Sequence, residues 1–230
     1  MSKFENLKTD QSVLALPLSR ELQPNREGFY TIYGKRMFDI AFALTLLPLL
    51  VPIILALAVL VKRDGGPAFF GHLRVGQHGR TFKCWKLRSM RPDAENYLKK
   101  YLDENPAARR EWEANYKLAD DPRITRIGKI IRKTSLDELP QILNVLVGEM
   151  SFVGPRPVLK DELLKYGTAQ QDYMAGRPGV TGLWQVTLRN DGPYEERVAL
   201  DVKYRRIENF WGDLKIIFLT PLKILKPTGQ

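Results

Sequence analysis

Two adjacent carboxylates, Asp137 and Glu138, are the residues whose types and position most clearly suggest chemistry. They follow a cationic run that ends at Arg132 and Lys133, and they precede an apolar stretch with helical periodicity. A carboxylate near the N-terminus of a helix is kept ionised by the helix dipole and by free N–H groups. It can then act as a nucleophile or as a magnesium ligand. Neighbours on a helix point about 100° apart, so we expect different roles for the two residues.

A helix cap is the alternative interpretation of the same pair. Ser135 followed by Glu138 fits a capping box, in which the two side chains satisfy free N–H groups at the start of a helix. The apolar residues that would continue the buried face of that helix are Leu139, Leu143 and Leu146. Pro140 is late for the first turn if Ser135 is the cap, so the start can shift by a residue or two. The local sequence leaves both interpretations open.

Cations on either side of the pair are candidates for binding phosphate oxygens. Arg132 precedes the pair, and Arg156 lies between two prolines that stiffen its backbone. Phosphoryl transfer requires a nucleophile, a metal ion and neutralisation of the charge around the phosphorus. The sequence offers candidate residues for each of these roles.

The charge of the chain indicates an anionic partner. The 230 residues carry a formal net charge of +10, with a pI near 9.7. Nucleic acid, anionic lipid and phosphorylated substrates all suit that balance. The chain has no aromatic–basic motif for reading nucleic acid, so we expect no nucleic-acid partner. A single cysteine, Cys84, excludes an internal disulfide, and His72 and His78 have no partners at zinc-ligand spacing.

One long apolar segment, residues 40–61, is expected to insert into a membrane. It contains no charge, and Thr45 is its only polar side chain. As a helix it would be about 33 Å long, enough to cross the hydrocarbon core of a bilayer. The segment begins too late and runs too long to be a removable signal peptide.

Two features favour a segment that enters the membrane and returns over one that crosses it. Pro48 and Pro52 lie one turn apart in its middle and disturb the helix. Positive residues favour the cytoplasmic side, and the two flanks carry equal numbers of them. These residues are Arg20, Arg26, Lys35 and Arg36 before the segment, and Lys62, Arg63, Arg74 and Arg80 after it. We expect a re-entrant helix-break-helix over residues 31–63, with a single crossing as the alternative.

The rest of the N-terminal half predicts a tail, a hairpin and two helices. Residues 1–30 are polar and aperiodic, which is typical of a flexible tail. Residues 68–90 alternate between apolar and basic side chains and predict a β-hairpin with its turn at Gly76–Gly79. Residues 93–118 are charged and predict a solvated helical pair, interrupted at Asn105-Pro106.

Two later segments have the composition of helices that lie at a lipid interface. Residues 121–133 predict an amphipathic helix, with an apolar stripe opposite a cationic one. The cations of that stripe are Arg123, Arg126, Lys129 and Lys133. Residues 210–226 are apolar and aromatic with interspersed lysines, and Pro221 is expected to break them into two short pieces. The whole chain is therefore predicted to be α+β and mostly helical, with a small hairpin and amphipathic interfacial helices.

Five motifs that occur in a fixed order resemble the bacterial sugar transferase family, the monotopic phosphoglycosyl transferases. They are Lys35–Asp39 (KRMFD), Phe82–Met90 (FKCWKLRSM), Leu136–Gln141 (LDELPQ), Met150–Pro157 (MSFVGPRP) and Arg177–Gln185 (RPGVTGLWQ). The resemblance covers about residues 33–226, and the ordered set is far more specific than any one motif. The inserted stretch 93–120 and Arg189–Asp191 look most like the priming hexose-phosphate transferases of exopolysaccharide synthesis.

This resemblance implies an activity and a mechanism. Members of the family transfer a sugar 1-phosphate from a UDP-sugar to polyprenyl phosphate in the inner membrane and release UMP. The family's aspartate, matched by Asp137, attacks the β-phosphate and forms a phosphosugar–enzyme intermediate. The adjacent glutamate, matched by Glu138, helps to prepare the lipid phosphate and the metal site. Mg²⁺ is required in the family, and Asp137 is its expected ligand here.

The resemblance also assigns binding roles and a membrane topology. The positions matched to phosphate contacts are Lys86, Arg132 and Arg156, and those matched to a segment near the nucleotide are Arg177, Pro178 and Gly179. The family uses a re-entrant membrane helix, and many members break it with a serine before the proline. Here Val51 precedes Pro52, so the serine is missing, and Pro48 is expected to compensate.

These inferences divide the chain into a flexible tail (1–30), a re-entrant membrane helix (31–63) and a catalytic domain (64–230) on the cytoplasmic face of the bacterial inner membrane. The expected partners are a UDP-sugar carrying galactose or glucose, undecaprenyl phosphate and anionic membrane lipid. If the chain forms an oligomer, we expect a homodimer. The alternative function is a non-enzymatic, membrane-anchored scaffold of a polysaccharide assembly complex, which would not depend on Asp137.

Overall fold

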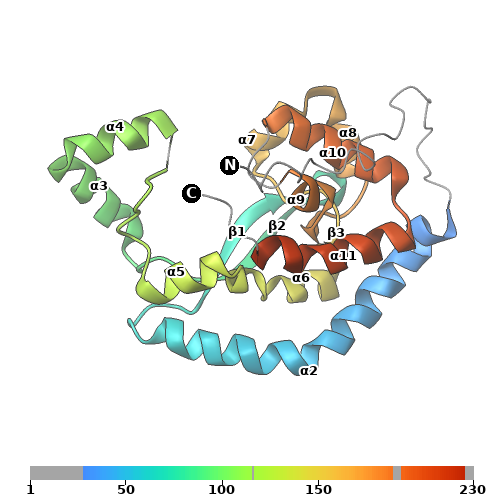
Figure 1. Ribbon diagram of the computed structural model, residues 1–230, viewed down its shortest axis with the longest axis horizontal. Coiled ribbons are helices and arrows are strands. Elements are labelled where there is room, and N and C mark those ends of the chain that lie inside the picture. Colours follow the sequence, from blue (N-terminus) through green and yellow to red (C-terminus); the bar gives the residue numbers. More distant parts are fainter. Residues whose placement is uncertain (1–27, 116, 189–192, 226–230) are drawn as a thin grey trace, which may run out of the picture.

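The computed structural model describes residues 28–115, 117–188 and 193–225 (Figure 1). Helices and turns dominate these ranges, and the four strands form two separate two-stranded sheets. The prediction of an α+β, mostly helical fold is therefore confirmed. The tail prediction for residues 1–30 falls almost wholly outside the described residues, as does Arg189–Asp191.

The elements follow one another in an order that begins with the apolar helix. They are η1 (Tyr30–Gly34), α2 (Lys35–Lys62), β1 (Phe69–Val75), η2 (Gln77–Gly79), β2 (Thr81–Leu87), α3 (Ala94–Glu104), α4 (Pro106–Asn115), α5 (Arg126–Lys133), η3 (Leu136–Glu138), α6 (Gln141–Val147), β3 (Ser151–Val153), α7 (Lys160–Leu163), η4 (Leu164–Ala169), α8 (Gln170–Met174), β4 (Gly179–Thr181), α9 (Leu183–Thr187), α10 (Tyr194–Ile207) and α11 (Phe210–Leu225). The elements named η are π or 3₁₀ helices.

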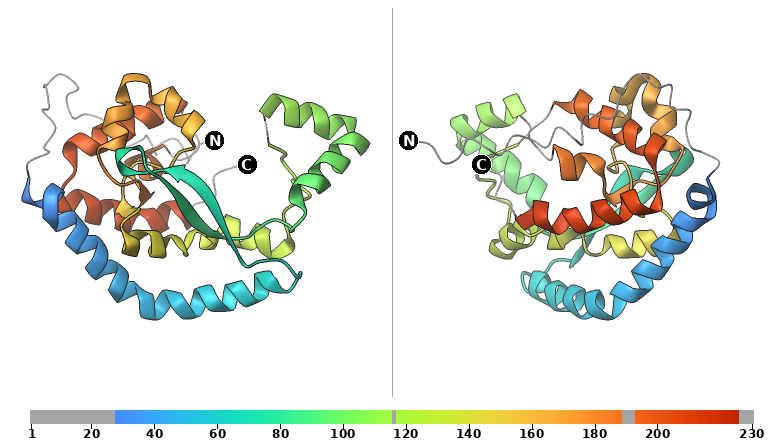
Figure 2. Two further views of the ribbon diagram at one scale, coloured as in Figure 1. Left: turned by 180° about the vertical axis from the view of Figure 1, so that it is seen from behind. Right: turned by 45° about the vertical axis from the view of Figure 1, so that its right-hand side comes forward.

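Helix α2 is continuous and bends near its middle (Figures 1 and 2). Pro48 and Pro52 lie inside it, and each lacks the N–H that would bond to the preceding turn. The predicted break is therefore a bend, because the helix continues on both sides of the prolines. Its buried residues lie toward the two ends, and around the bend Leu46, Leu47 and Leu50 are half-buried against the core.

The apolar stretch Tyr30–Lys62 is long and apolar enough to cross a membrane, judged by length and composition. Only 17% of its most apolar window is buried inside the protein, whereas the core helix of a soluble domain would be mostly buried. The large apolar residues that α2 leaves exposed are Met37, Leu44, Leu49, Val51, Ile53, Leu55, Val59 and Leu60. Membrane association is the setting that suits such a surface.

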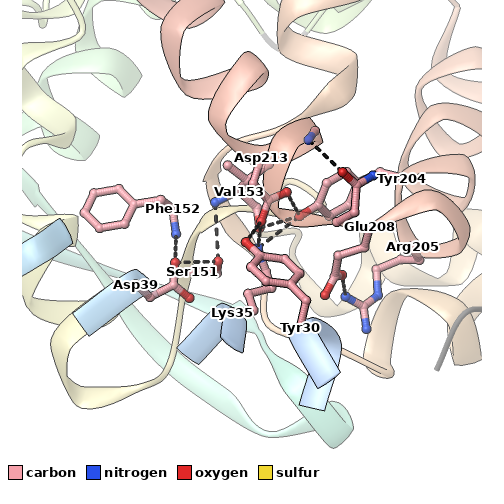
Figure 3. A network of polar contacts seen from close by, with 12 residues as sticks. Tyr30, Lys35, Asp39, Ser151, Phe152, Val153, Tyr204, Arg205, Glu208 and Asp213 are labelled. Carbon is pink, nitrogen blue, oxygen red and sulfur yellow. Dashed lines mark hydrogen bonds and ion pairs between the residues drawn. The ribbon is translucent and has the colours of Figure 1, made fainter. Parts of the chain in front are cut away.

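A buried polar network holds the N-terminal end of α2 (Figure 3). Lys35 donates to Asp213 of α11 at 2.5 Å and to the hydroxyl of Tyr204 of α10 at 3.0 Å. One turn later, the carboxylate of Asp39 accepts from the hydroxyl of Ser151 and from the next backbone N–H of β3, each at 3.0 Å. Because buried charges are tolerated only when paired, this network fixes the helix to β3, α10 and α11.

Arg88, just after β2, holds the other end of α2. Its guanidinium forms two hydrogen bonds with the carboxylate of Asp64 and donates to the carbonyl of Val61 at 3.2 Å. It also donates to the carbonyls of Pro67 and Met90, each at 2.6 Å. Both ends of the apolar helix are thus attached to the same folded unit.

The predicted hairpin is confirmed as β1 and β2. They pair antiparallel along their full lengths, and Gly76–Gly79 reverse the chain between them. Phe82 and Cys84 are buried against α6, as their alternation with basic residues predicted. The hairpin runs along the back of the molecule, from a tip beside α8 to an open end near the C-terminal end of α2 (Figure 2).

Helices α3 and α4 form an arm that projects from the main body (Figure 1). As predicted, they are separate helices that meet at Asn105-Pro106, and no residue of α3 is buried. Two arginines stack on rings of the arm near its base. Arg91 lies 4.0 Å from the ring centre of Tyr97, and Arg123 lies 5.0 Å from that of Trp112.

The amphipathic helix that follows the arm is shorter than predicted. Helix α5 begins at Arg126 because the side chain of Thr125 caps it, accepting the N–H of Gly128 at 2.9 Å. Arg123 therefore lies outside the helix, where it pairs with Asp121 at 2.6 Å. The predicted cationic stripe keeps three of its four members.

Helix α11 corrects the prediction of two short C-terminal pieces. It runs through Pro221 without interruption over its 16 residues. At about 24 Å it is still too short to cross a bilayer. Trp211, Phe218 and Leu222 are exposed on it, while Ile216 packs in a cluster with Val153 of β3.

Candidate active site

Asp137 and Glu138 lie in the 3₁₀ turn η3, between α5 and α6. Ser135 precedes this turn in the left-handed region, with φ of 56°, and its side chain makes no capping hydrogen bond. Helix α6 begins only at Gln141, after Pro140. The capping-box prediction is therefore wrong, because the chain makes a separate turn before the helix starts. The predicted buried stripe is also incomplete, since Leu143 is exposed.

Lys86 joins the two carboxylates from the end of β2. Its ammonium nitrogen lies 2.6 Å from Oε1 of Glu138 and 3.8 Å from Oδ2 of Asp137. The exposed fractions of the side chains are 13% for Asp137, 29% for Lys86 and 37% for Glu138, so the cluster is open to solvent on the Glu138 side. A cation held between two acids is an arrangement suited to chemistry rather than to helix capping.

Burial raises the pKa of the Asp137 carboxyl above its ordinary value. Lys86 lowers that pKa, Glu138 raises it and Arg132 lowers it. We expected the N-terminus of a helix to keep Asp137 ionised, but Asp137 lies before the first turn of α6. In the structure, the neighbouring cations Lys86 and Arg132 favour the ionised form instead.

Asn144 fixes β2 against α6 and so sets the position of Lys86 relative to Asp137. It is fully buried in α6. Its carbonyl oxygen accepts the backbone N–H of Trp85 at 3.1 Å, and its amide donates to the carbonyl of Lys83 at 2.8 Å. Sequence reasoning missed this residue, although a polar side chain within the apolar run QILNVLV was the available signal.

Arg156 approaches the same face of the hairpin from the loop after β3. Its exposed guanidinium lies 5.6 Å from the ring centre of Trp184, and its backbone N–H bonds to buried Asp201. Burial, and then repulsion from Arg156, lower the pKa of Arg74. Charges on Lys86, Glu138, Arg74 and Arg156 all act on the pKa of the Cys84 thiol, so each of these groups lies near it. Arg74 was not among the predicted site residues.

Arg177, Pro178 and Gly179 lie at the opposite end of α6. Nε of Arg177 donates to the carbonyl of Gly148, directly after that helix, at 2.8 Å. The carbonyl of Pro178 accepts from β3, and Gly179 opens β4, where a Cβ would come within 2.1 Å of a backbone nitrogen. Among the described residues, Lys86 and Arg132 therefore act directly on Asp137, whereas no contact of Asp137 with Arg156 or with these three residues is described.

Comparisons with known proteins identify the family of this chain. The family described as bacterial sugar transferase matches residues 30–227. An undecaprenyl-phosphate galactose phosphotransferase from Salmonella typhimurium is 49% identical over 195 residues, covering 85% of this chain and 41% of its own. The exopolysaccharide production protein ExoY from Sinorhizobium fredii is 49% identical over 188 residues, covering 81% and 83%.

A third relative, the UDP-glucose:undecaprenyl-phosphate glucose-1-phosphate transferase from Escherichia coli, is 36% identical over 198 residues, covering 82% of this chain and 39% of its own. The chain thus spans about two fifths of the Salmonella and Escherichia relatives. The family match covers the apolar helix, the hairpin, the carboxylate turn and α11 together. This chain belongs to the bacterial sugar transferase family.

Proposed function

We propose that this chain transfers a hexose 1-phosphate from a UDP-sugar to undecaprenyl phosphate and releases UMP, through a covalent intermediate on Asp137. The observation that carries the proposal is the Lys86 ammonium between the carboxylates of Asp137 and Glu138, with Arg132 near enough to lower the pKa of Asp137. Three relatives are named for undecaprenyl phosphate or a lipid carrier.

In the first step, Oδ2 of Asp137 attacks the β-phosphorus of the donor. A bond forms between the aspartyl oxygen and phosphorus, the bond to the bridging oxygen of UMP breaks, and UMP leaves with the electron pair. The carboxylate must be ionised for this attack. Lys86 favours that state, and it can also compensate the charge that builds on the phosphoryl oxygens.

In the second step, a phosphate oxygen of undecaprenyl phosphate attacks the same phosphorus. The acyl–phosphate bond breaks, Asp137 is regenerated as a carboxylate, and the product is a lipid diphosphate carrying the hexose. Glu138 is more exposed than Asp137, so it is the carboxylate that can accept a proton from the incoming lipid phosphate. Arg156 and Arg132 supply positive charge for the two phosphates.

Magnesium fits the carboxylate pair only together with the donor. Among the described residues, no group of three or more His, Cys, Asp or Glu side chains could hold a metal ion. Mg²⁺ is usually bound by one or two carboxylates and by substrate phosphates, so Asp137 and Glu138 would hold it once a diphosphate is present. When bound, it would neutralise charge on the diphosphate.

The membrane placement proposed here is a re-entrant α2 with both ends on the cytoplasmic face of the inner membrane. The attachment of both ends to one folded unit supports it, since a straight 28-residue helix would separate its ends by about 42 Å. Exposed Leu143 and Val147 of α6, and Trp211 of α11, add apolar surface suited to the headgroup zone. An enzyme in that plane reaches both the lipid phosphate and the cytosolic nucleotide.

Cysteine labelling tests the re-entrant topology. Tyr33→Cys and Arg63→Cys place a thiol at each exposed flank, and the native Cys84 is buried. Intact spheroplasts would be treated with a membrane-impermeant maleimide. We expect neither flank to react until the membrane is permeabilised. Reaction of one flank from outside would show a single crossing and defeat this topology.

A donor panel tests the reaction itself. The membrane-bound protein would be given undecaprenyl phosphate, Mg²⁺ and either UDP-galactose or UDP-glucose labelled in the sugar, and label in the chloroform phase and UMP would be measured. Galactose is the expected sugar, because three relatives are named for galactose, with glucose as the alternative. Equal appearance of UMP and lipid-bound label supports the function. Failure with every hexose donor contradicts it.

A further inference from the structure

A cavity lies at the C-terminal end of α6, away from Asp137. Its volume is about 700 Å³, and it is formed by η1 and the start of α2, the hairpin tip, α8 and the segment before β4. Asp137 and Lys86 are not among its lining residues. Lys86 lies five residues along β2 from Thr81, the first strand residue after the hairpin tip, about 17 Å away. The cavity therefore lies at the other end of β2 from Lys86.

Four cations line the cavity, and only two of them have acidic partners among the described residues. Lys35 pairs with Asp213, and Arg205 pairs with Glu208. Arg36 and Arg177 form no ion pair with any residue that the structure describes. The cavity thus holds two arginines that have no ion-pair partner among the described residues.

The two arginines retain donors for a ligand. Arg36 uses one N–H on the carbonyl of Val145 and one on that of Leu146, and Arg177 uses one on that of Gly148. Each guanidinium has five N–H groups, so most remain available. Burial, and then repulsion from Arg36, lower the pKa of Arg177, and the more weakly acting Asp39 raises it, so a further anion would stabilise the charged pair.

Exposed apolar residues border the cavity on the side of η1. Ile32 lines it and is 52% exposed, and Phe29, Tyr33 and Met37 nearby are 75%, 61% and 66% exposed. Lys35 and Arg36 begin the apolar helix. A phosphate site next to such a surface suits a ligand that carries both an anionic group and hydrocarbon chains.

We propose that the phosphate of an anionic phospholipid headgroup binds in this cavity between Arg36 and Arg177, while its acyl chains lie against the exposed residues of η1 and α2. The proposal rests on the membrane placement proposed above, but not on the chemistry at Asp137. Such a lipid would join α2, α6 and β4 at the membrane surface and so support the orientation of the site.

Titration calorimetry on the detergent-purified full chain would test this with dihexanoyl phosphatidylglycerol, dihexanoyl phosphatidylcholine and inorganic phosphate. Arg177→Gln removes one cation. Gln171→Glu adds a negative charge to the cavity, and no described hydrogen bond is lost with the Gln171 side chain. Gln170→Glu is the matched control, since it makes the same change on the same helix outside the cavity.

We expect phosphatidylglycerol to bind the wild type most tightly, and both cavity variants to weaken it by about tenfold or more, because a like charge or a lost cation disfavours an anion. Gln170→Glu should bind as the wild type does. Unchanged affinity in Gln171→Glu and in folded Arg177→Gln would overturn the proposal. Preference for inorganic phosphate over the lipid would overturn the lipid assignment. UMP release in the same preparations separates either result from a failure of the proposed function.

Discussion

The charged groups at the two ends of helix α6 have opposite effects on the stability of the fold. At the C-terminal end, Arg36 and Arg177 donate to carbonyls of the last turn and of Gly148, and their charge complements the negative end of the helix dipole. At the N-terminal end, Asp137 and Glu138 cap nothing, and burial works against ionisation of Asp137. The arginines stabilise the C-terminal end of α6, whereas the charge on Asp137 at the N-terminal end lowers the folding stability. Such an unfavourable charge is typical of a reactive group.

Replacement of Asp137 is expected to have the largest effect on activity. Asp137→Asn should lower UMP release by at least about a thousandfold, as expected for loss of a nucleophile. Because burial raises the pKa of Asp137, ionising it costs folding free energy as pH rises through that pKa. The variant should therefore melt at the same or a higher temperature than the wild type at pH 8, with no gain at pH 3. Thermal unfolding at both values, beside a UMP assay, checks this, and a large loss of stability at pH 8 would contradict it.

Removal of Lys86 should change how the rate depends on pH. In Lys86→Gln, Asp137 loses the cation that lowers its pKa most, so the acid limb of the pH–rate profile should move to higher pH. The rate at its plateau should also fall by about a hundredfold, since the phosphoryl charge loses a donor. An acid limb that stays in place would show that Asp137 does not titrate in the rate-determining step.

Replacement of Glu138 should move the same limb in the other direction. Glu138→Gln removes a neighbouring negative charge that raises the pKa of Asp137, so activity should persist to lower pH than in the wild type. We expect the plateau rate to fall by about tenfold to a hundredfold from loss of the proton acceptor. A full pH–rate profile of both variants gives the comparison, and shifts of equal sign would refute the electrostatic account.

The contact that fixes β2 against α6 can be removed while Asp137 and Glu138 stay unchanged. Asn144→Ala leaves the N–H of Trp85 and the carbonyl of Lys83 without a partner, at a cost of about 1–3 kcal/mol in unfolding free energy. Activity per folded molecule should fall several-fold through kcat, because Lys86 is no longer held against Asp137. Denaturant unfolding and steady-state kinetics separate the two effects, and unchanged kcat in the folded fraction would rule out a positioning role.

At the C-terminal end of α6, substitution should affect stability more than catalysis. Gly148 has φ of +89°, and a Cβ there would lie 3.3 Å from a guanidinium nitrogen of Arg36. Gly148→Ala should thus cost about 1 kcal/mol in unfolding free energy and change UMP release little. A loss of activity as large as that of Lys86→Gln would show that the two ends are not functionally distinct.

The parts of the fold that local patterns specify were predictable. Alternation of Phe82 and Cys84 with basic residues identified the hairpin, and the uncharged stretch around Thr45 identified α2. The start of α5 was placed too early, because periodicity cannot show that Thr125 is the cap. Ser135 failed as a cap because its left-handed backbone belongs to a separate turn.

The site depends on contacts between residues far apart in the chain, which local patterns do not contain. Lys86 reaches Glu138 across 52 residues, and Trp85 reaches Asn144 across 59. Family motifs supplied the identity of Lys86 and Arg156, but not their geometry. The same motifs suggested Arg177 near the nucleotide, which stays a prediction, and they did not show that Arg177 donates to the carbonyl of Gly148 at the end of α6.

The most direct test of the central claim is to trap the intermediate on Asp137. Protein would be mixed with UDP-galactose labelled with ³²P in the β-phosphate and with Mg²⁺, without undecaprenyl phosphate, then quenched within milliseconds and digested for mass spectrometry. The account predicts one galactose-phosphate adduct on the peptide that contains Asp137, formed together with UMP and discharged when undecaprenyl phosphate is added. Normal transfer to the lipid with no adduct on that peptide at any time would contradict it.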